Sequence, residues 1–434
     1  MDLTPRSGTR AALESFLADP RLSSALSFTI ITATIAADPV RRLIGWPGYG
    51  AALVVLVLLA GASLFARRGT LEWRGLLPVS LLVFVGWCGL TILWTAQQWS
   101  ALGGVAHQVA VAFLAVYVAL VRDLIQVIRD FGDVLRGYLA ISLALEIFAG
   151  LLIDQPIEWL GIDGDLAAGG PIQGLAGNRN QLGLIAVIAL ITFAIETNTR
   201  SIPTMLGVFS LIGATATLLL TGSPVAIGTA LAVAIATGVI LALRTVPDSR
   251  RRFWDIAVAA VAVVAIIVVF ASRQGIVRVL SAATEVESRL ELWRSLGALI
   301  PFHQLEGWGW VGIWRADQTP YAGLGVTEGL HGSALNAYVD VVFQAGLVGL
   351  FAFIVLVGLG FVRSWLVATR RKTVSYLWPA LVMVALLVTS LAESSVLVDF
   401  GWLTLVVCIT RAAQTMSWRS AWMATQSTDL PRGR

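Results

Sequence analysis

Long apolar segments dominate this chain and restrict what it can fold into. A membrane-spanning helix needs roughly 20 mostly apolar residues. Twelve segments come close to that length: 22–37, 45–66, 76–94, 104–121, 137–153, 181–196, 203–221, 224–243, 253–271, 337–361, 376–392 and 395–411. With 57% hydrophobic and only 13% charged residues, the chain lacks the polar surface that a soluble protein needs. We therefore expect an all-α, polytopic membrane protein with about twelve transmembrane helices.

Basic residues are unevenly distributed between alternate loops. If the N-terminus is cytoplasmic, 22 of the 30 Lys and Arg residues lie in cytoplasmic segments and 8 in outer segments. Cytoplasmic loops of membrane proteins carry an excess of Lys and Arg. This distribution predicts that both termini are cytoplasmic. The small net charge of +4 is a topology signal and does not indicate nucleic-acid binding.

The longest polar stretch divides the chain into three parts. Residues 1–271 form an N-terminal bundle of about nine spans, and residues 337–434 contain the last helices and a cytoplasmic tail. Residues 272–336 between them hold five of the eight outer arginines and two of the three histidines. Because a loop of that length in a compact protein is usually functional, we expect an extracytoplasmic functional loop here.

Within this loop, residues 285–300 have the pattern of an amphipathic helix. Val286, Leu290, Trp293 and Leu296 recur at helical spacing, which favours a helix lying on the membrane. Its two arginines, Arg289 and Arg294, then lie near the outer headgroups. They can grip a phosphate of a bound substrate in a bidentate manner, or pair with lipid phosphates while their stems cover apolar surface.

An aromatic, glycine-rich stretch follows at 301–314. Three tryptophans alternate there with glycines, and Arg315 comes directly after them. Aromatic rings beside polar groups suit the face of a sugar, but tryptophan is also common at membrane interfaces without any ligand. Trp293 and Arg315 are therefore candidate substrate-binding residues.

The segment 331–349 leads from the loop into the next span. His331 is a candidate general base because imidazole titrates near neutral pH, although by itself a histidine here is more simply interpreted as a surface residue at a helix start. Asn336, Asp340 and Gln344 are spaced one turn apart. A polar stripe that enters a membrane must face protein or water, so Asn336 and Asp340 are also candidate substrate-binding residues.

The earlier outer segment ends in G-N-R-N-Q-L-G at 177–183, where another span opens. Asn178 or Asn180 can cap this helix. Its N-terminus, with Arg179 beside it, can bind an anion. All three residues are candidate substrate contacts.

The remaining ionisable residues inside spans are few. His107 and Glu146 lie in neighbouring spans and are interpreted as a structural hydrogen-bonded pair, with a proton path as the alternative. Cys88 and Cys408 are isolated packing residues. Three scattered histidines form no metal pattern, so we expect no metal site.

Taken in order, these motifs resemble the O-antigen ligase and polymerase family of bacterial membrane glycosyltransferases. They are G-N-R-N-Q-L-G opening a span, then S-R-L-E-L-W, then G-W-G-W-V-G, an outer-loop histidine, and L-N separated by nine residues from G-L-V-G. The resemblance covers roughly residues 170–360. It implies a GT-C-like, all-helical enzyme of the bacterial inner membrane that is active on its outer face.

The resemblance also implies a chemistry. Such proteins move a glycan from a polyprenyl-diphosphate carrier to a glycan or lipid-glycan acceptor, with no metal, nucleotide sugar or other cofactor. Arg289 matches the loop arginine that grips the diphosphate, and a base in the same loop activates the acceptor hydroxyl. Asn336, Gly346 and Gly349 match the segment with the pattern H-N…G-x-x-G.

Two positions depart from the family pattern. Leu335 stands where the family often has the histidine before Asn336, so His331, four residues earlier, becomes the candidate base. Pro224 stands where an arginine often follows serine, and Arg179 from the neighbouring loop is the candidate replacement. The resemblance leaves ligase and polymerase activity equally open.

Two other classes of function compete with a glycosyltransferase. A transporter or flippase of lipid-linked or amphiphilic substrates predicts functional charges deep in the bundle, for which His107 and Glu146 are the candidates. A scaffold in an envelope assembly complex predicts that Arg289 and His331 can each be replaced without loss of function.

Overall fold

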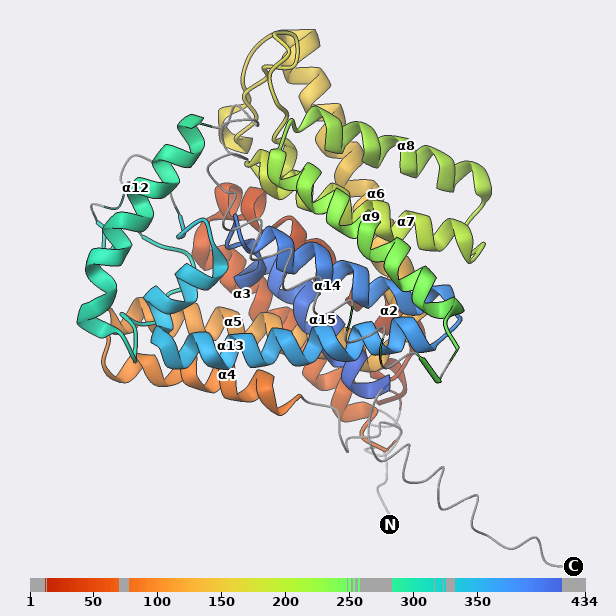
Figure 1. Cartoon of the computed structure of the whole chain (residues 1–434), viewed down its shortest axis with the longest axis horizontal. Helices are drawn as coiled ribbons and strands as arrows, with labels where there is room; N and C mark the ends of the chain where they lie inside the picture. Colours follow the sequence, from red (N-terminus) through yellow and green to blue (C-terminus); the bar gives the residue numbers. More distant parts are fainter. Residues whose placement is uncertain are drawn as a thin grey trace, which may run out of the picture.

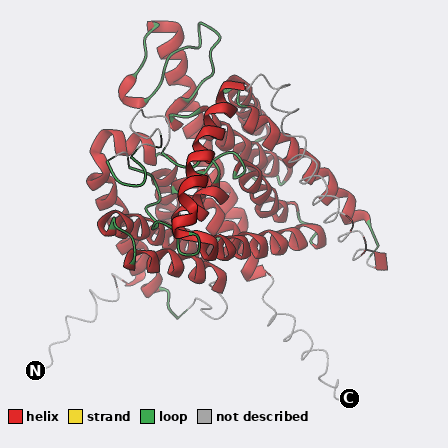
Figure 2. Ribbon diagram, turned by 60° about the vertical axis from the view of Figure 1, so that its left-hand side comes forward, coloured by secondary structure: helices red, strands yellow, loops and turns green. Residues whose placement is uncertain are grey.

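The computed structural model describes residues 14–69, 78–247, 283–315, 317–322 and 332–415, together with a few single residues outside these ranges. This described part is built of helices and loops and contains no strand, apart from one isolated bridge between Ile157 and Ile162 (Figure 2). The prediction of an all-α protein is confirmed. The predicted division at residues 271 and 336 remains a prediction.

Twelve helices of ten or more residues lie in the described part. They are α2 (Pro20–Ile35), α3 (Ala37–Ala66), α4 (Val79–Leu90), α5 (Gln98–Val121), α6 (Leu124–Ile147), α7 (Arg179–Asn198), α8 (Thr204–Leu220), α9 (Pro224–Thr245), α12 (Ala283–Leu299), α13 (Ala337–Arg370), α14 (Leu377–Thr389) and α15 (Asp399–Thr415). All except α12 overlap a predicted span, and the predicted span 253–271 lies outside the described residues apart from two single positions.

Six of these helices are long and apolar enough to cross a membrane: α3, α5, α6 with its π-helical extension to Ile153, α7, α9 and α13. The chain is therefore an integral membrane protein. Shorter apolar helices include α8 and the segments around α4 and α14. The predicted total of about twelve spans goes beyond the six that length and composition support in the described part.

The centre of the bundle is formed by the C-terminal helices. Helix α15 packs against α5, α13 and α14, and almost all of its side chains are buried. Trp402 of α15 is fully buried, and its indole Nε1 donates to the Gln108 carbonyl of α5 at 3.1 Å. Figure 1 shows α7, α8 and α9 on one side of this centre and α12 standing across one end of the bundle.

Helix α13 is broken at Gly346, near its N-terminal end. The backbone there has φ 69° and ψ −173°, a conformation essentially restricted to glycine. Residues 304–309 dock into the break, and their backbone hydrogen bonds replace those that the helix loses. Trp308 and Gly309 donate to the carbonyls of residues 343 and 344, while the N–H groups of residues 347 and 348 donate to the carbonyls of residues 304 and 305. Such compensation is required wherever a helix breaks inside a membrane protein.

Helix α12 confirms the helix predicted at 285–300, but its buried face differs in part from the predicted apolar face. Leu292 and Leu296 are buried against the protein, whereas Leu290 is 40% exposed. Arg289 and Trp293 are half-buried on the side that faces the bundle, and Arg294 is exposed. The helix is therefore oriented by packing against the bundle, and this orientation separates the two arginines that the pattern grouped together.

Candidate functional site

Four segments that are distant in sequence meet at the side chain of Glu393, in the turn between α14 and α15. Its Oε1 accepts from the Arg289 guanidinium of α12 at 3.0 Å and from the Asn180 amide of α7 at 2.7 Å. Asn180 in turn accepts from the hydroxyl of Ser223, at the start of α9, at 2.6 Å. Glu393 is 7% exposed and Asn180 is 5% exposed. We call these four residues the Glu393 cluster.

Three helices begin beside this cluster. Helix α7 begins at Asn178, whose Oδ1 accepts from the backbone N–H of Asn180 at 2.7 Å. Helix α9 begins at Ser223, which caps it by accepting from the Ala226 N–H. Helix α13 begins at Asn336, whose amide Nδ2 donates to the Leu391 carbonyl at 2.9 Å. Because a helix N-terminus carries partial positive charge, the three ends together favour an anion here, and Glu393 is the anion that they surround.

Arg289 is held by backbone as well as by charge. Its Nη1 donates to the Leu335 carbonyl at 3.3 Å and also to the Ala392 carbonyl. The neighbouring Trp293 donates through its indole nitrogen to the Ala334 carbonyl at 2.8 Å. These bonds fix α12 to the turn that precedes α13, so the guanidinium is positioned before any ligand binds.

The aromatic stretch around Trp310 is attached to α13 by the polar stripe. The Gln344 Oε1 accepts from the N–H groups of Val311 and Gly312 at 2.8 and 2.9 Å. Asp340 accepts from the Trp314 indole at 3.0 Å. Asp340 and Gln344 are both buried. The sequence left protein or water as the environment of this stripe; Asp340 and Gln344 face protein and hold the loop onto the helix.

Four other predicted site residues, Arg294, Arg315, Arg179 and His331, are not part of the Glu393 cluster. Arg294 is exposed on the outer side of α12. Arg315 is exposed and pairs with Asp317 at 3.1 Å, and this hydrogen bond lowers the pKa of the Asp317 carboxyl. Arg179 is half-buried at the first turn of α7, beside the cluster. His331 lies outside the described residues.

The interpretation of His107 and Glu146 as a pair is wrong. His107 Nε2 lies 3.1 Å from Asp399 Oδ1, and Arg41 donates to the other Asp399 oxygen at 2.7 Å. Glu146 accepts from the backbone N–H of Gln173 at 2.8 Å and of Gly174 at 2.6 Å. His107 therefore pairs with Asp399 of α15, and Glu146 pairs with the backbone of residues 173 and 174.

Glu393 and Asp399 are the two site residues that sequence reasoning missed. Glu393 stands between the last two predicted spans, and Asp399 stands near the start of the last one, in an otherwise apolar region. Charged groups are costly to bury in a membrane protein without partners. Two carboxyl groups in an apolar region therefore indicated that partners must exist. Those partners come from α3, α5, α7 and α12, so no local pattern identifies them.

Replacing Glu393 by Gln is expected to destabilise the protein by about 2–3 kcal/mol. The amide keeps the shape but removes the charge opposite Arg289, and it presents N–H groups toward the donors of Arg289 and Asn180. Thermal unfolding of the purified protein in detergent measures the effect. Glu291→Gln, on the exposed side of α12, is the matched control. Equal unfolding temperatures for Glu393→Gln and wild type would contradict the assigned role.

One protein family matches part of this chain. Residues 208–354 match the model of the O-antigen ligase family, and the matched segment contains Arg289 and Asn336. Asn180 and Glu393, which contribute to the cluster, lie outside the matched segment. No curated protein matches the chain. The resemblance carried by the sequence motifs is thus supported by an independent match to the O-antigen ligase family over this part of the chain.

Proposed function

We propose that this protein transfers a glycan from a polyprenyl-diphosphate carrier to a hydroxyl group of a glycan or lipid-glycan acceptor. In the reaction, the bond between the anomeric carbon and the diphosphate oxygen breaks. A bond from the acceptor oxygen to that carbon forms, the acceptor proton passes to a base, and the diphosphate leaves with its carrier. The enzyme needs a cationic site for the leaving group and a base for the acceptor.

The observation that carries this proposal is the fixed position of Arg289 beside three helix N-termini. Negative charge grows on the diphosphate as it leaves, and prearranged positive groups stabilise that charge. Arg289 is held in place by two carbonyls and Glu393, so it loses little freedom when it binds a phosphate. We propose that the diphosphate binds beside Arg289 and accepts part of the hydrogen bonding that the guanidinium now directs to Glu393.

Arg179 is proposed as a second cation for the diphosphate. The hydrogen bond between Asn180 and Ser223 brings the first turn of α7 next to the start of α9. There Pro224 replaces the arginine of the family pattern. A charge at Arg179 therefore enters the same region from the neighbouring helix. Asn178, Trp293, Asn336 and Asp340 are proposed to shape the site, and His331 is the proposed base.

We further propose that the protein resides in the bacterial inner membrane, with both termini cytoplasmic and the Glu393 cluster toward the outer face. The uneven distribution of Arg and Lys supports this orientation. In it, α3, α5, α7, α9 and α13 begin on the outer side. The donor would then reach the cluster from the outer leaflet.

The proposal is tested in a deletion strain complemented with the wild-type gene or with His331→Ala. Loss of the transferred glycan, with build-up of its lipid-linked precursor on the outer face, is the expected result of deletion. Failure of His331→Ala to restore transfer identifies that histidine as the base. If the precursor instead collects on the cytoplasmic face, the protein is a flippase and the proposal is wrong.

A further inference from the structure

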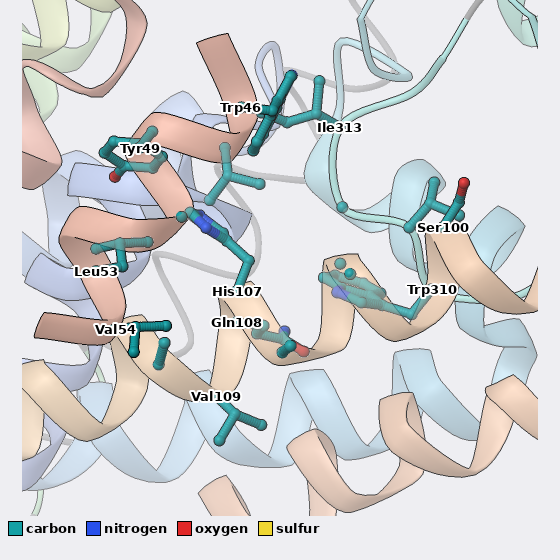
Figure 3. A pocket seen from close by; sticks show the side chains of 18 of the residues that line it. Trp46, Tyr49, Leu53, Val54, Ser100, His107, Gln108, Val109, Trp310 and Ile313 are labelled. Atoms are coloured by element: carbon teal, nitrogen blue, oxygen red, sulfur yellow. The ribbon is translucent and has the colours of Figure 1, made fainter. Parts of the chain in front are cut away.

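A cavity of about 920 Å³ lies between α3, α5 and the aromatic stretch 310–315. Figure 3 shows Trp46, Tyr49 and Leu53 of α3 facing His107 and Val109 of α5, with Trp310 and Ile313 beside them. Leu397 and Val398 complete the wall. We call this cavity the α3–α5 groove.

The two helices run in the same direction along the groove. Tyr49 packs near His107, with ring centroids 5.9 Å apart, and Gly61 faces Phe113 further along. The lining covers residues 46–58 of α3 and 99–113 of α5. At about 1.5 Å per residue, the groove is roughly 18–21 Å long, comparable with one leaflet of a membrane.

The polarity of the groove changes along its length. Near the N-terminal ends of the helices it is lined by Trp46, Trp99, Ser100 and Arg315. Near its other end the lining consists of aliphatic and aromatic side chains such as Leu58 and Phe113. Trp99 is 87% exposed and Leu58 is 66% exposed, so large apolar side chains stand on the rim. Since α3 and α5 are long enough to span a membrane, we expect this rim to face lipid and the groove to open sideways into the bilayer.

From this arrangement we infer that the α3–α5 groove binds the hydrocarbon chain of a polyprenyl phosphate. The inference rests on the proposed function, and it assigns the lipid part of the donor to residues outside the Glu393 cluster. At about 30 Å³ per atom, the volume of a water molecule in the liquid, the groove holds on the order of 30 atoms. That is more than one ordinary acyl chain fills, and a channel between two helices suits one chain better than the paired chains of a glycerolipid.

The charged end of the groove suits a phosphate. Arg315 lies on the rim, and its ion pair with Asp317 is exposed and therefore weak. A phosphate of the lipid can replace Asp317 there. Just behind the same end, the Arg41 guanidinium lies 4.7 Å from the centre of the Trp46 ring and binds Asp399.

The groove and the Glu393 cluster share structural parts. The stretch 310–315 lines the groove and is bonded to Gln344 and Asp340 of α13. Residues 393–399 run from the cluster to the groove, where Leu397 and Val398 form the wall. These shared segments connect the groove to the cluster.

Two glycines of the groove lining have open space where a side chain would begin. A Cβ added at Gly50 or Gly103 meets no atom within 4 Å, and both residues line the groove. Gly228 on α9 is equally open but does not line the groove. Gly50→Phe and Gly103→Phe are the test variants, and Gly228→Phe is the matched control.

The experiment measures binding of a radiolabelled polyprenyl monophosphate to the purified full-length protein in detergent. We expect both test variants to bind about tenfold more weakly than wild type, which corresponds to about 1.4 kcal/mol, while Gly228→Phe stays close to wild type. Wild-type affinity in both test variants would overturn the inference. Displacement of the probe by an equal concentration of phosphatidylglycerol would also overturn it, because the groove would then hold ordinary lipid.

The probe carries no glycan, so its binding does not depend on transfer. If glycan transfer is absent but the probe still binds through the groove, the proposed function fails and the groove assignment stands. If transfer occurs but the groove variants bind the probe normally, the groove assignment fails alone.

Discussion

Arg289→Ala is expected to reduce glycan transfer by about 10²–10³-fold, the usual effect of removing one prearranged group that stabilises charge in a transition state. The alanine variant loses the cation that stands among the N-termini of α7, α9 and α13. It also leaves Glu393 without its charged partner, which lies 3.0 Å away in the wild type. Transfer is measured with purified protein and a lipid-linked glycan donor, so expression level does not enter the rate.

Arg294→Ala is the matched control for this variant. It removes an arginine five residues further along the same helix, whose side chain is exposed. We expect it to transfer glycan at nearly the wild-type rate. Arg289→Lys helps to separate charge from geometry, because lysine keeps the charge but cannot make the same forked contacts. Wild-type transfer by Arg289→Ala would refute the role of this residue.

Because Arg289 also holds α12, its loss has a structural component. Breaking a buried ion pair by removing one partner commonly costs about 3–5 kcal/mol. The unfolding temperature of Arg289→Ala is therefore measured with its activity. Loss of transfer in a protein that still unfolds cooperatively identifies the chemical role. If Arg289→Ala is unfolded at the assay temperature, the transfer rate of Arg289→Lys is measured instead.

Gly346→Ala is expected to prevent assembly of α13 with the 304–309 segment. The backbone at Gly346 has φ 69° and ψ −173°, and a side chain in that region costs about 1–3 kcal/mol. An added Cβ would also lie 2.1 Å from the Leu305 carbonyl oxygen, so the docked backbone must move away. We expect a combined destabilisation of at least about 3 kcal/mol and little folded protein in the membrane.

Gly358→Ala tests whether this effect belongs to the break. Gly358 lies on the same helix, and a Cβ there meets no atom within 4 Å. We expect this control to accumulate and unfold like wild type. The measurements are the amount of membrane-inserted protein that resists protease and its unfolding temperature. Normal assembly of Gly346→Ala would show that the docked segment tolerates displacement.

Local patterns were sufficient for much of the fold and part of the site. Apolar length predicted the positions of eleven of the twelve described helices, of which six are long and apolar enough to cross a membrane, and helical spacing predicted α12. Asn178 and Asn180 were both candidate caps because they stand before an apolar run, and Asn178 is the cap. The polar stripe on α13 was expected to face protein or water, and Asp340 and Gln344 face protein. In each case the physical preference acts within a few residues, so neighbouring residues are enough to reveal it.

The sequence by itself determined that the chain is helical and that it is a membrane protein, and it placed Arg289 in a segment that resembles a family motif. Only the tertiary structure decided which charges meet. Glu393 bonds to Arg289 and Asn180, each of which is more than 100 positions away in the sequence. Asp399 bonds to Arg41 and His107, which lie in the N-terminal part of the chain. Because a buried charge needs a partner but does not specify where in the chain that partner stands, the pairing follows from helix packing and not from any local pattern.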